Sequence, residues 1–257
     1  MASNPIDQFQ LQTIAEFSVG GLDLSFTNSS YYMLVAAGLT IGLLAMAMSR
    51  PALVPGRMQS VAELTYEFVA GMIRSTAGTD GLRFFPLVFT LFAFILMANM
   101  LSMMHYFPSP GWYGFTIMSH IIITFALSMI VMSVLVIYGI WKNGMKFFSL
   151  FFPAGVPWPL YFLLTPIEII SFLSRPVTLS MRLFANMLAG GILLKVFAGF
   201  VVMMGAAGGL IAVGAIAPMV MVVALTGLKF LIAFLQAYVF AVLTCIYLSD
   251  ALHPGHH

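Results

Sequence analysis

An arginine inside a long apolar segment is the residue of this sequence best placed to do chemistry. Arg182 lies in the segment 174–194, SRPVTLSMRLFANMLAGGILL, whose other members are mostly apolar or small. A charged side chain at the centre of a bilayer costs about 2.5–3.5 kcal/mol on insertion scales, so it usually faces a protein partner or a water-filled cavity. Asn186 follows four residues later and shares the same helix face. The alternative is an arginine at a helix end that reaches back to the headgroups, but apolar sequence continues well beyond Arg182.

A second apolar segment, near the C-terminus, carries three polar residues on one helix face. Lys229 and Gln236 are seven residues apart, which is two helical turns, and Tyr247 returns to the same direction. Polar stripes on two neighbouring helices predict a hydrated path or a polar seam between them. The simpler alternatives are an interhelical hydrogen bond for Gln236 and a Lys229 side chain that reaches the membrane surface.

A carboxylate and two isolated polar residues complete the candidates. Glu168 lies in an apolar, proline-rich stretch and is either a proton relay or an ion-pair partner of Arg175, seven residues later. Asn99 and His120 lie in two further apolar segments. His120 is expected near the outer surface, where a histidine can titrate near neutral pH or simply anchor the helix.

Motifs for bond chemistry are absent from the sequence. It contains no phosphate-binding P-loop, no dinucleotide-binding glycine motif and no HExxH zinc motif. We therefore expect no cofactor, no metal and no enzymatic activity from the chain on its own.

The composition assigns these residues to a membrane. The chain has 257 residues, of which 61% are hydrophobic and 7% charged, against about 25% charged residues in soluble domains. The apolar runs are long enough for membrane helices of about 20 residues, and the alternation of a β-barrel is absent. The predicted class is an all-α integral membrane protein with a single membrane domain over residues 1–257. A net charge of +2 without a basic block gives no indication of a nucleic-acid partner.

About five transmembrane helices are predicted from the apolar runs. They cover residues 31–48, 84–106, 118–141, 176–203 and 217–248. The last two are long: at 1.5 Å per residue the helix over 176–203 measures roughly 40 Å, against a hydrocarbon core of about 30 Å. We therefore expect these two helices to be strongly tilted or to extend beyond the core.

Three other segments are not expected to cross the membrane. Residues 1–30 are predicted to form an outer N-terminal segment. Residues 58–77 combine apolar positions at helical spacing with interspersed charges, which predicts an amphipathic helix at the interface. Residues 147–173 are apolar but broken by prolines, which favours a re-entrant helical hairpin.

The distribution of basic residues predicts the orientation. The Lys and Arg residues between the spans all fall in the first and third connections: Arg50, Arg57, Arg74, Arg83, Lys142 and Lys146. Because basic residues gather on the cytoplasmic side, we expect the N-terminus outside and the C-terminus in the cytoplasm.

Two segments allow a family to be suggested. SRPVTLSMRLFANMLAG (174–190) and FLQAYVFAVLTCIYLSDALH (234–253) resemble the two signature helices of subunit a of F-type ATP synthases. FTNS (26–29), LVPGRMQSVAELTYEFV (53–69) and SHIIITFAL (119–127) extend the resemblance over nearly the whole chain. The resemblance is to the alphaproteobacterial and mitochondrial branch.

The resemblance implies a role and partners. Subunit a is the stator half of a proton motor in a bacterial inner membrane, or alternatively in the mitochondrial inner membrane. In the lipid bilayer it packs against a rotating ring of c subunits. Its other partners are b-type peripheral stalk subunits and the rest of the synthase, including the soluble ATPase head. The two long C-terminal helices would lie tilted along the ring.

The resemblance also assigns roles to residues. Arg182 matches the family's essential arginine, Asn186 and Gln236 match its polar neighbours, and Glu168 matches a carboxylate of the cytoplasmic half-channel. Two positions where the family often has His or Glu are Gly191 and Lys229 here. The outer half-channel of this chain therefore differs from the common pattern.

Gly191 and Lys229 are expected to lie side by side. Counted from a turn near residue 210, each is nineteen residues away, so antiparallel helices would place them at similar depth. We expect the Lys229 stem to fill the space beside Gly191 and its amine to meet water, either as a proton carrier or only as packing.

Two other classes of protein compete with the motor subunit. A secondary ion transporter or channel also has discontinuous helices and charges at mid-membrane, but such proteins tend to show two corresponding halves, which are absent here. A purely structural membrane scaffold is disfavoured by Arg182.

Overall fold

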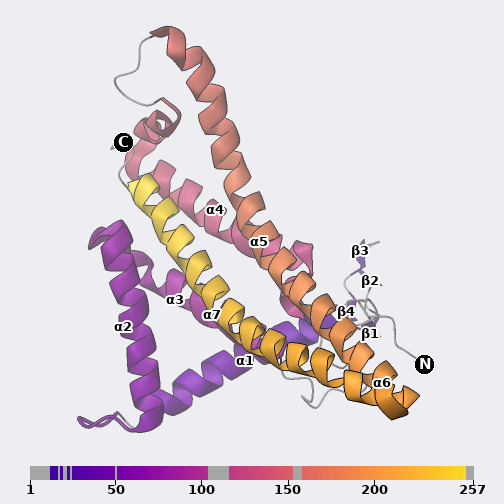
Figure 1. Cartoon of the computed structure of the whole chain (residues 1–257). Coiled ribbons are helices and arrows are strands. Elements are labelled where there is room, and N and C mark those ends of the chain that lie inside the picture. The colour runs from indigo at the N-terminus through magenta and orange to yellow at the C-terminus, as the bar shows by residue number, and fades with distance from the viewer. Residues whose placement is uncertain are drawn as a thin grey trace. The chain divides into compact units, whose positions relative to one another are not determined.

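The fold consists almost entirely of helices (Figure 1). The structure is a computed structural model that describes residues 12–16, 18–19, 22–23, 25–49, 51–103, 116–152 and 158–252. Within this part of the chain, five helices are long and apolar enough to cross a membrane. This confirms the predicted all-α integral membrane class.

The helices follow one another along the chain. They are α1 (Asn28–Met48), α2 (Arg57–Ala77), the 3₁₀ turn η2 (Asp80–Phe84), α3 (Phe85–Leu101), η3 (Ile117–Ser119), α4 (Ile121–Asn143), η4 (Gly144–Phe151), α5 (Trp158–Ala207), α6 (Gly209–Gly214) and α7 (Ile216–Leu252). The five predicted apolar runs lie in α1, α3, α4, α5 and α7. Residues 104–106, at the end of the second run, lie outside the described residues.

Four short strands precede α1. β1 (Thr13–Ala15) pairs antiparallel with β4 (Phe26–Thr27), and β2 (Ser18–Val19) pairs with β3 (Leu22–Asp23). The backbone N–H of Gln12 donates to the Asn28 Oδ1 (3.3 Å), and the N–H of Asn28 donates to the Gln12 carbonyl (3.0 Å), which joins the strands to the start of α1. Strands of two or three residues leave no alternating pattern in a sequence, so the prediction for residues 1–30 missed them.

The amphipathic segment predicted over 58–77 is helix α2. Val69 and Ile73 are buried, whereas Val61 and Leu64 are more than half exposed. The helix ends at Gly78, whose φ of 69° is a backbone conformation that favours glycine. Its placement at the membrane interface stays a prediction.

The re-entrant hairpin predicted over 147–173 is not confirmed, because residues 158–173 are the beginning of a longer helix. Helix α5 begins at Trp158 and continues as one helix of 50 residues through Pro166 and Pro176. Pro159 is the second residue of the helix, where a missing N–H costs little. The two interior prolines each remove one hydrogen bond, which membrane helices tolerate. Residues 153–157 lie outside the described residues.

The chain divides into two compact units. Unit 1 contains residues 1–40, 94–121 and 183–236, and unit 2 contains residues 41–93, 122–182 and 237–257. Helix α5 passes from unit 2 to unit 1 between Arg182 and Leu183, and α7 passes back between Gln236 and Ala237. The two long helices therefore each contribute to both units.

Within unit 1, α5 and α7 run antiparallel on either side of a glycine break (Figure 1). The break is at Gly208 and Gly209, which have φ values of 70° and 59°. Near it, a Cβ added at Gly214 would lie 2.7 Å from the Met204 methyl, so the two segments approach closely. The turn expected near residue 210 thus lies at Gly208, directly before α6 (Gly209–Gly214).

Within unit 2, an apolar cluster joins four elements. It consists of Met132 and Leu135 of α4, Phe147 of η4, Phe172 of α5 and Ala251 of α7. The Phe147 ring lies directly over Gly139, where an added Cβ would overlap it. This glycine therefore makes the room in which η4 packs against α4.

A methyl group at Gly139 is expected to displace the Phe147 ring. Gly139→Ala should lower the free energy of unfolding by about 1–3 kcal/mol, the usual cost of overpacking. Gly42→Ala in α1, where a Cβ would meet no atom within 4 Å, is the control and should be neutral or slightly stabilising. Thermal unfolding of the detergent-solubilised protein measures both, and equal midpoints would contradict the packing of Phe147 against Gly139.

Candidate functional site

Arg182 lies on an exposed face of α5. Its neighbours Leu179, Leu183 and Met187 are buried, whereas Arg182 is exposed and Met181 beside it is 47% exposed. Among the described residues, no carboxylate lies within ion-pair distance of Arg182. The described residues therefore do not neutralise this charge.

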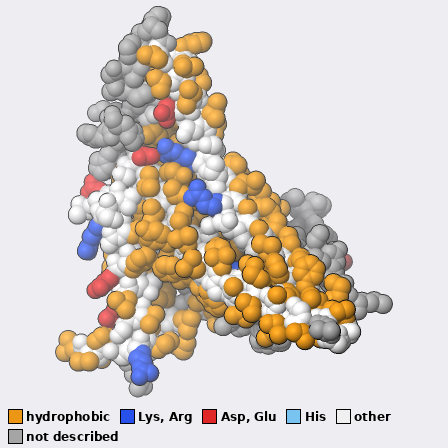
Figure 2. Space-filling model, in the orientation of Figure 1, with side chains coloured by type: hydrophobic (Ala, Val, Ile, Leu, Met, Phe, Trp, Pro, Cys, Tyr) orange, Lys and Arg blue, Asp and Glu red, His pale blue; other side chains and the backbone are white. Residues whose placement is uncertain are grey.

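The surface around the long helices is apolar. Figure 2 shows hydrophobic side chains covering much of the visible face of α5, α6 and α7, with few charged side chains between them. The exposed apolar residues of α5 and α7 include Leu193, Phe200, Leu231, Phe234 and Leu235. Because lipid does not solvate a guanidinium, an exposed arginine on such helices requires water or a charged partner.

Gln236 and Asn186 both lie in unit 1 but differ in burial. Gln236 is 7% exposed and belongs to the buried face of α7, with Ala233, Ala237 and Phe240. Asn186 is half-buried, one turn after Arg182 on α5. Gln236 thus points into the protein, whereas the arginine does not.

A polar cluster lies inside unit 1 between α3, α5 and α7. The Asn99 Nδ2 donates to the carbonyl of Ala233 (3.2 Å), one turn after Lys229. Asn99 is fully buried, and its Oδ1 accepts no hydrogen bond from the described residues. The stem carbons of Lys229 lie 3.5–3.7 Å from the position that a Cβ of Gly190 would occupy. The structure therefore brings Asn99, Gly190 and Lys229 together.

Lys229 contacts Gly190, one residue before the predicted Gly191. Gly191 is buried, whereas Gly190 is half-buried. Counting residues from the turn estimates depth along the helices, but neighbouring residues differ by about 100° in direction. The pairing of Gly191 itself with Lys229 stays a prediction.

His120 belongs to unit 1 and precedes α4 directly. It is half-buried, and burial lowers the pKa of its imidazole. The neutral form is therefore favoured near neutral pH. The structure leaves His120 a candidate for the outer half-channel.

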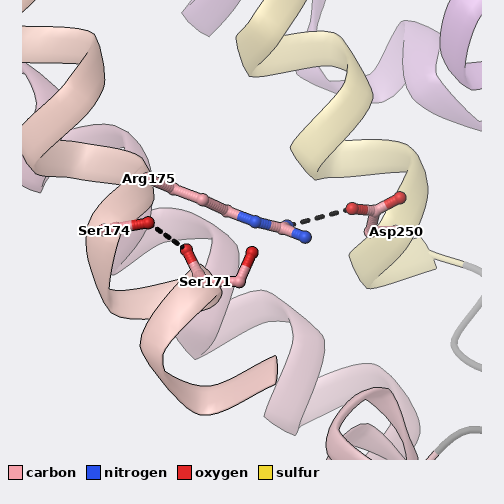
Figure 3. A network of polar contacts seen from close by, with 4 residues as sticks. All are labelled: Ser171, Ser174, Arg175 and Asp250. Atoms are coloured by element: carbon pink, nitrogen blue, oxygen red, sulfur yellow. Dashed lines mark hydrogen bonds and ion pairs between the residues drawn. The ribbon is translucent and has the colours of Figure 1, made fainter. Parts of the chain in front are cut away.

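Glu168 does not pair with Arg175, so that alternative is wrong. Arg175 Nη1 lies 2.9 Å from Asp250 Oδ2 of α7 (Figure 3). Glu168 is half-buried on α5, and among the described residues it forms no ion pair. Tyr247 lies on the other side of this pair, with its ring centre 4.9 Å from the Arg175 guanidinium carbon.

Sequence reasoning missed Asp250 as the partner of Arg175. A signal was present: Arg175 is 35 residues before the turn near residue 210 and Asp250 is 40 after it. The depth argument applied to Gly191 and Lys229 would have brought this pair close together as well.

Comparison with known proteins gives the family. The chain matches the ATP synthase A chain family over residues 30–249. It is 62% identical over 255 residues to the ATP synthase subunit a of Maricaulis maris, covering 99% of each chain. It is 56% identical to the proteins of the same name from Allorhizobium ampelinum, over 257 residues, and from a Chelativorans species, over 256 residues, covering 100% of each chain.

The family match and the full-length similarity to these relatives show that the chain belongs to the ATP synthase subunit a family.

Proposed function

We propose that this chain is the stator subunit of the proton motor of an F-type ATP synthase in a bacterial inner membrane. It translocates protons and itself makes or breaks no other covalent bond. The observation that carries the proposal is Arg182, an exposed charge on an apolar helix at the position of the family's essential arginine. A multi-pass chain with the N-terminus outside and the C-terminus in the cytoplasm follows from its basic residues.

The partner of Arg182 is a ring of c subunits. Each carries a carboxylate that must be neutral while it faces lipid. Beside a guanidinium the ionised carboxylate is favoured, because opposite charges stabilise each other. The proton therefore leaves or joins the ring on either side of Arg182, and each charge that crosses releases about 2.3 kcal/mol per 100 mV.

Arg182 also acts as a barrier. An arginine stays protonated at every working pH, so it cannot take up a proton on one side and release it on the other. A proton must travel with the ring instead. The apolar surface of α5, α6 and α7 supports contact with the ring, and b-type stalk subunits with the soluble ATPase head complete the complex.

The other candidate residues divide between the two units. Unit 1 contains Asn99, His120, Asn186, Gly191, Lys229 and Gln236, and unit 2 contains Glu168 and Tyr247. Every Lys and Arg in the connections between the spans belongs to unit 2. By the positive-inside rule, we assign Glu168 to the cytoplasmic half-channel and the polar cluster of unit 1 to the outer one.

The polar cluster of unit 1 supports a hydrated outer path. A buried acceptor such as the Asn99 Oδ1 normally binds protein or water. Asn99 contacts the turn of α7 that follows Lys229, so water bound there would lie near the lysine stem. An amine can carry protons only if it also releases them, and release becomes easier as the pH rises. Any contribution of Lys229 to proton transfer should therefore increase with pH.

Removal of the Arg182 charge should stop the motor. Arg182→Ala is expected to abolish ATP-driven proton pumping in inverted membrane vesicles while the assembled complex remains. Met181→Ala, at the exposed neighbour, is the control and should pump normally. Wild-type pumping by an assembled Arg182→Ala complex would exclude the stator-charge role.

Loss of the Glu168 carboxylate should slow proton flux. Glu168→Gln removes the titratable group with little change in size, so flux should fall without loss of assembly. Ile167→Ala, at an exposed apolar neighbour, controls for a change in the helix surface. A drop in assembled complex with normal flux per complex would instead make Glu168 structural.

The role of Lys229 can be separated from packing by pH. If the amine carries protons, Lys229→Ala should weaken proton-driven ATP synthesis most at alkaline pH. Lys195→Ala, at the lysine of α5, is the control and should show no such trend.

A packing role predicts a different pattern. Gly190→Leu, which collides with the lysine stem, should be harmful in either case, whereas Gly199→Leu meets no atom within 4 Å of its Cβ. Unchanged synthesis by Lys229→Ala at every pH would exclude the carrier role.

A further inference from the structure

The C-terminal turn of α7 is held by side chains of two other elements of unit 2. The Asn143 Nδ2 of α4 donates to the carbonyl of Ala251 (2.7 Å), one of the last carbonyls of a helix, which have no partner within it. Arg175 of α5 pairs with Asp250 at 2.9 Å (Figure 3). Ala251 and Leu252 are buried. This end of α7 is therefore fixed rather than frayed.

Asp250 depends on Arg175 for its place. A negative charge in the last turn of a helix is disfavoured by the helix dipole. The Arg175 and Asp250 side chains are only 19% and 14% exposed, so either charge would be poorly hydrated without the other. The guanidinium carbon also lies 4.9 Å from the ring centre of Tyr247 and 5.6 Å from that of Phe172. Three side chains thus hold Arg175 in one position.

The helix that carries Arg175 is weakened at the next residue. Pro176 has no N–H to donate to the carbonyl of Phe172, so the backbone alone holds the direction of α5 less firmly there. The hydroxyls of Ser174 and Thr178 donate to the carbonyls of Ser171 (2.7 Å) and Arg175 (3.0 Å), and neither bond involves the Phe172 carbonyl. The contacts of Arg175 supply a constraint where the helix lacks one.

Arg175 is also placed to direct Arg182. The two arginines are seven residues apart, which is two turns, about 10 Å along the axis and nearly the same direction. Both belong to unit 2, as do Tyr247 and Asp250. The bond that Pro176 lacks is to the Phe172 carbonyl, before Arg175, and the helix continues from Arg175 through Arg182. A rotation of α5 at Arg175 would therefore turn Arg182 as well.

We propose that the Arg175–Asp250 ion pair is a clamp that fixes the direction of Arg182 relative to residues 237–252 of α7. The clamp rests on the proposed function, because the direction of Arg182 matters only if the arginine faces the ring. Arg175 and Asp250 are positioning residues, and neither carries a proton. Their loss should uncouple proton movement from ATP hydrolysis in complexes that still assemble.

The test measures coupling per assembled complex in inverted vesicles. Arg175→Gln and Asp250→Asn should each lower the ratio of proton pumping to ATP hydrolysis about threefold or more. The reversed pair, Arg175→Asp with Asp250→Arg, should recover at least half of the ratio, since it restores attraction and places a cation at a helix C-terminus. The control is Lys142→Gln, which breaks the more exposed Lys142–Asp80 pair (4.0 Å) and should leave the ratio unchanged.

Conservative variants keep the test decisive if the neutral ones do not assemble. Arg175→Lys and Asp250→Glu retain the charges. Their ratios of proton pumping to ATP hydrolysis should lie between that of the wild type and those of the neutral variants. A ratio per complex that stays at wild type in all single variants, with or without less complex, would overturn the clamp and leave a structural pair. A reversed pair no better than the single variants would overturn it too.

Arg182→Ala, measured in parallel, separates the two proposals. If it stops pumping while the Arg175 and Asp250 variants stay coupled, only the clamp fails. If Arg182→Ala itself pumps normally, the stator role fails and the clamp fails with it.

Discussion

Lipid cannot solvate a guanidinium, so the Arg182 side chain needs water or a charged partner within the membrane. The arrangement of the long helices depends on this requirement. The buried side of α5, with Leu179, Leu183 and Met187, fixes the helix against the chain and leaves the arginine outward. No carboxylate among the described residues neutralises it. The described residues therefore leave this charge without a carboxylate partner, which is consistent with the proposed role in a motor.

Most of the candidate polar residues lie on the two long helices, α5 and α7. Helix α5 changes unit directly after Arg182, and α7 changes unit directly after Gln236. The polar residues on one side of these points belong to unit 1 and those on the other side to unit 2. Helix α5 is continuous through this point, and the permanently protonated Arg182 is the last residue that it contributes to unit 2.

Sequence reasoning predicted what depends on long patterns and missed what depends on single contacts. Apolar runs and helical spacing predicted α1, α3, α4, α7 and the amphipathic α2, because each pattern is repeated over many residues. The prolines of 147–173 did not reveal where α5 begins, since Pro159 is its second residue and the helix tolerates Pro166 and Pro176. The contact of Lys229 with Gly190 and the pairing of Arg175 with Asp250 depend on side-chain direction, which spacing alone does not define.

Two arginines on α5 show how surroundings assign different tasks to one residue type. Arg175 and Arg182 are two turns apart on nearly the same helix face, and neither loses its proton. Arg175 is satisfied within the chain by Asp250, Tyr247 and Phe172, so it can act only as a fixed point. Arg182 has no such carboxylate partner among the described residues, so its charge is available to a partner. The Arg182 charge keeps a constant direction toward a moving partner only if α5 does not rotate. In the proposed clamp, the contacts of Arg175 prevent that rotation.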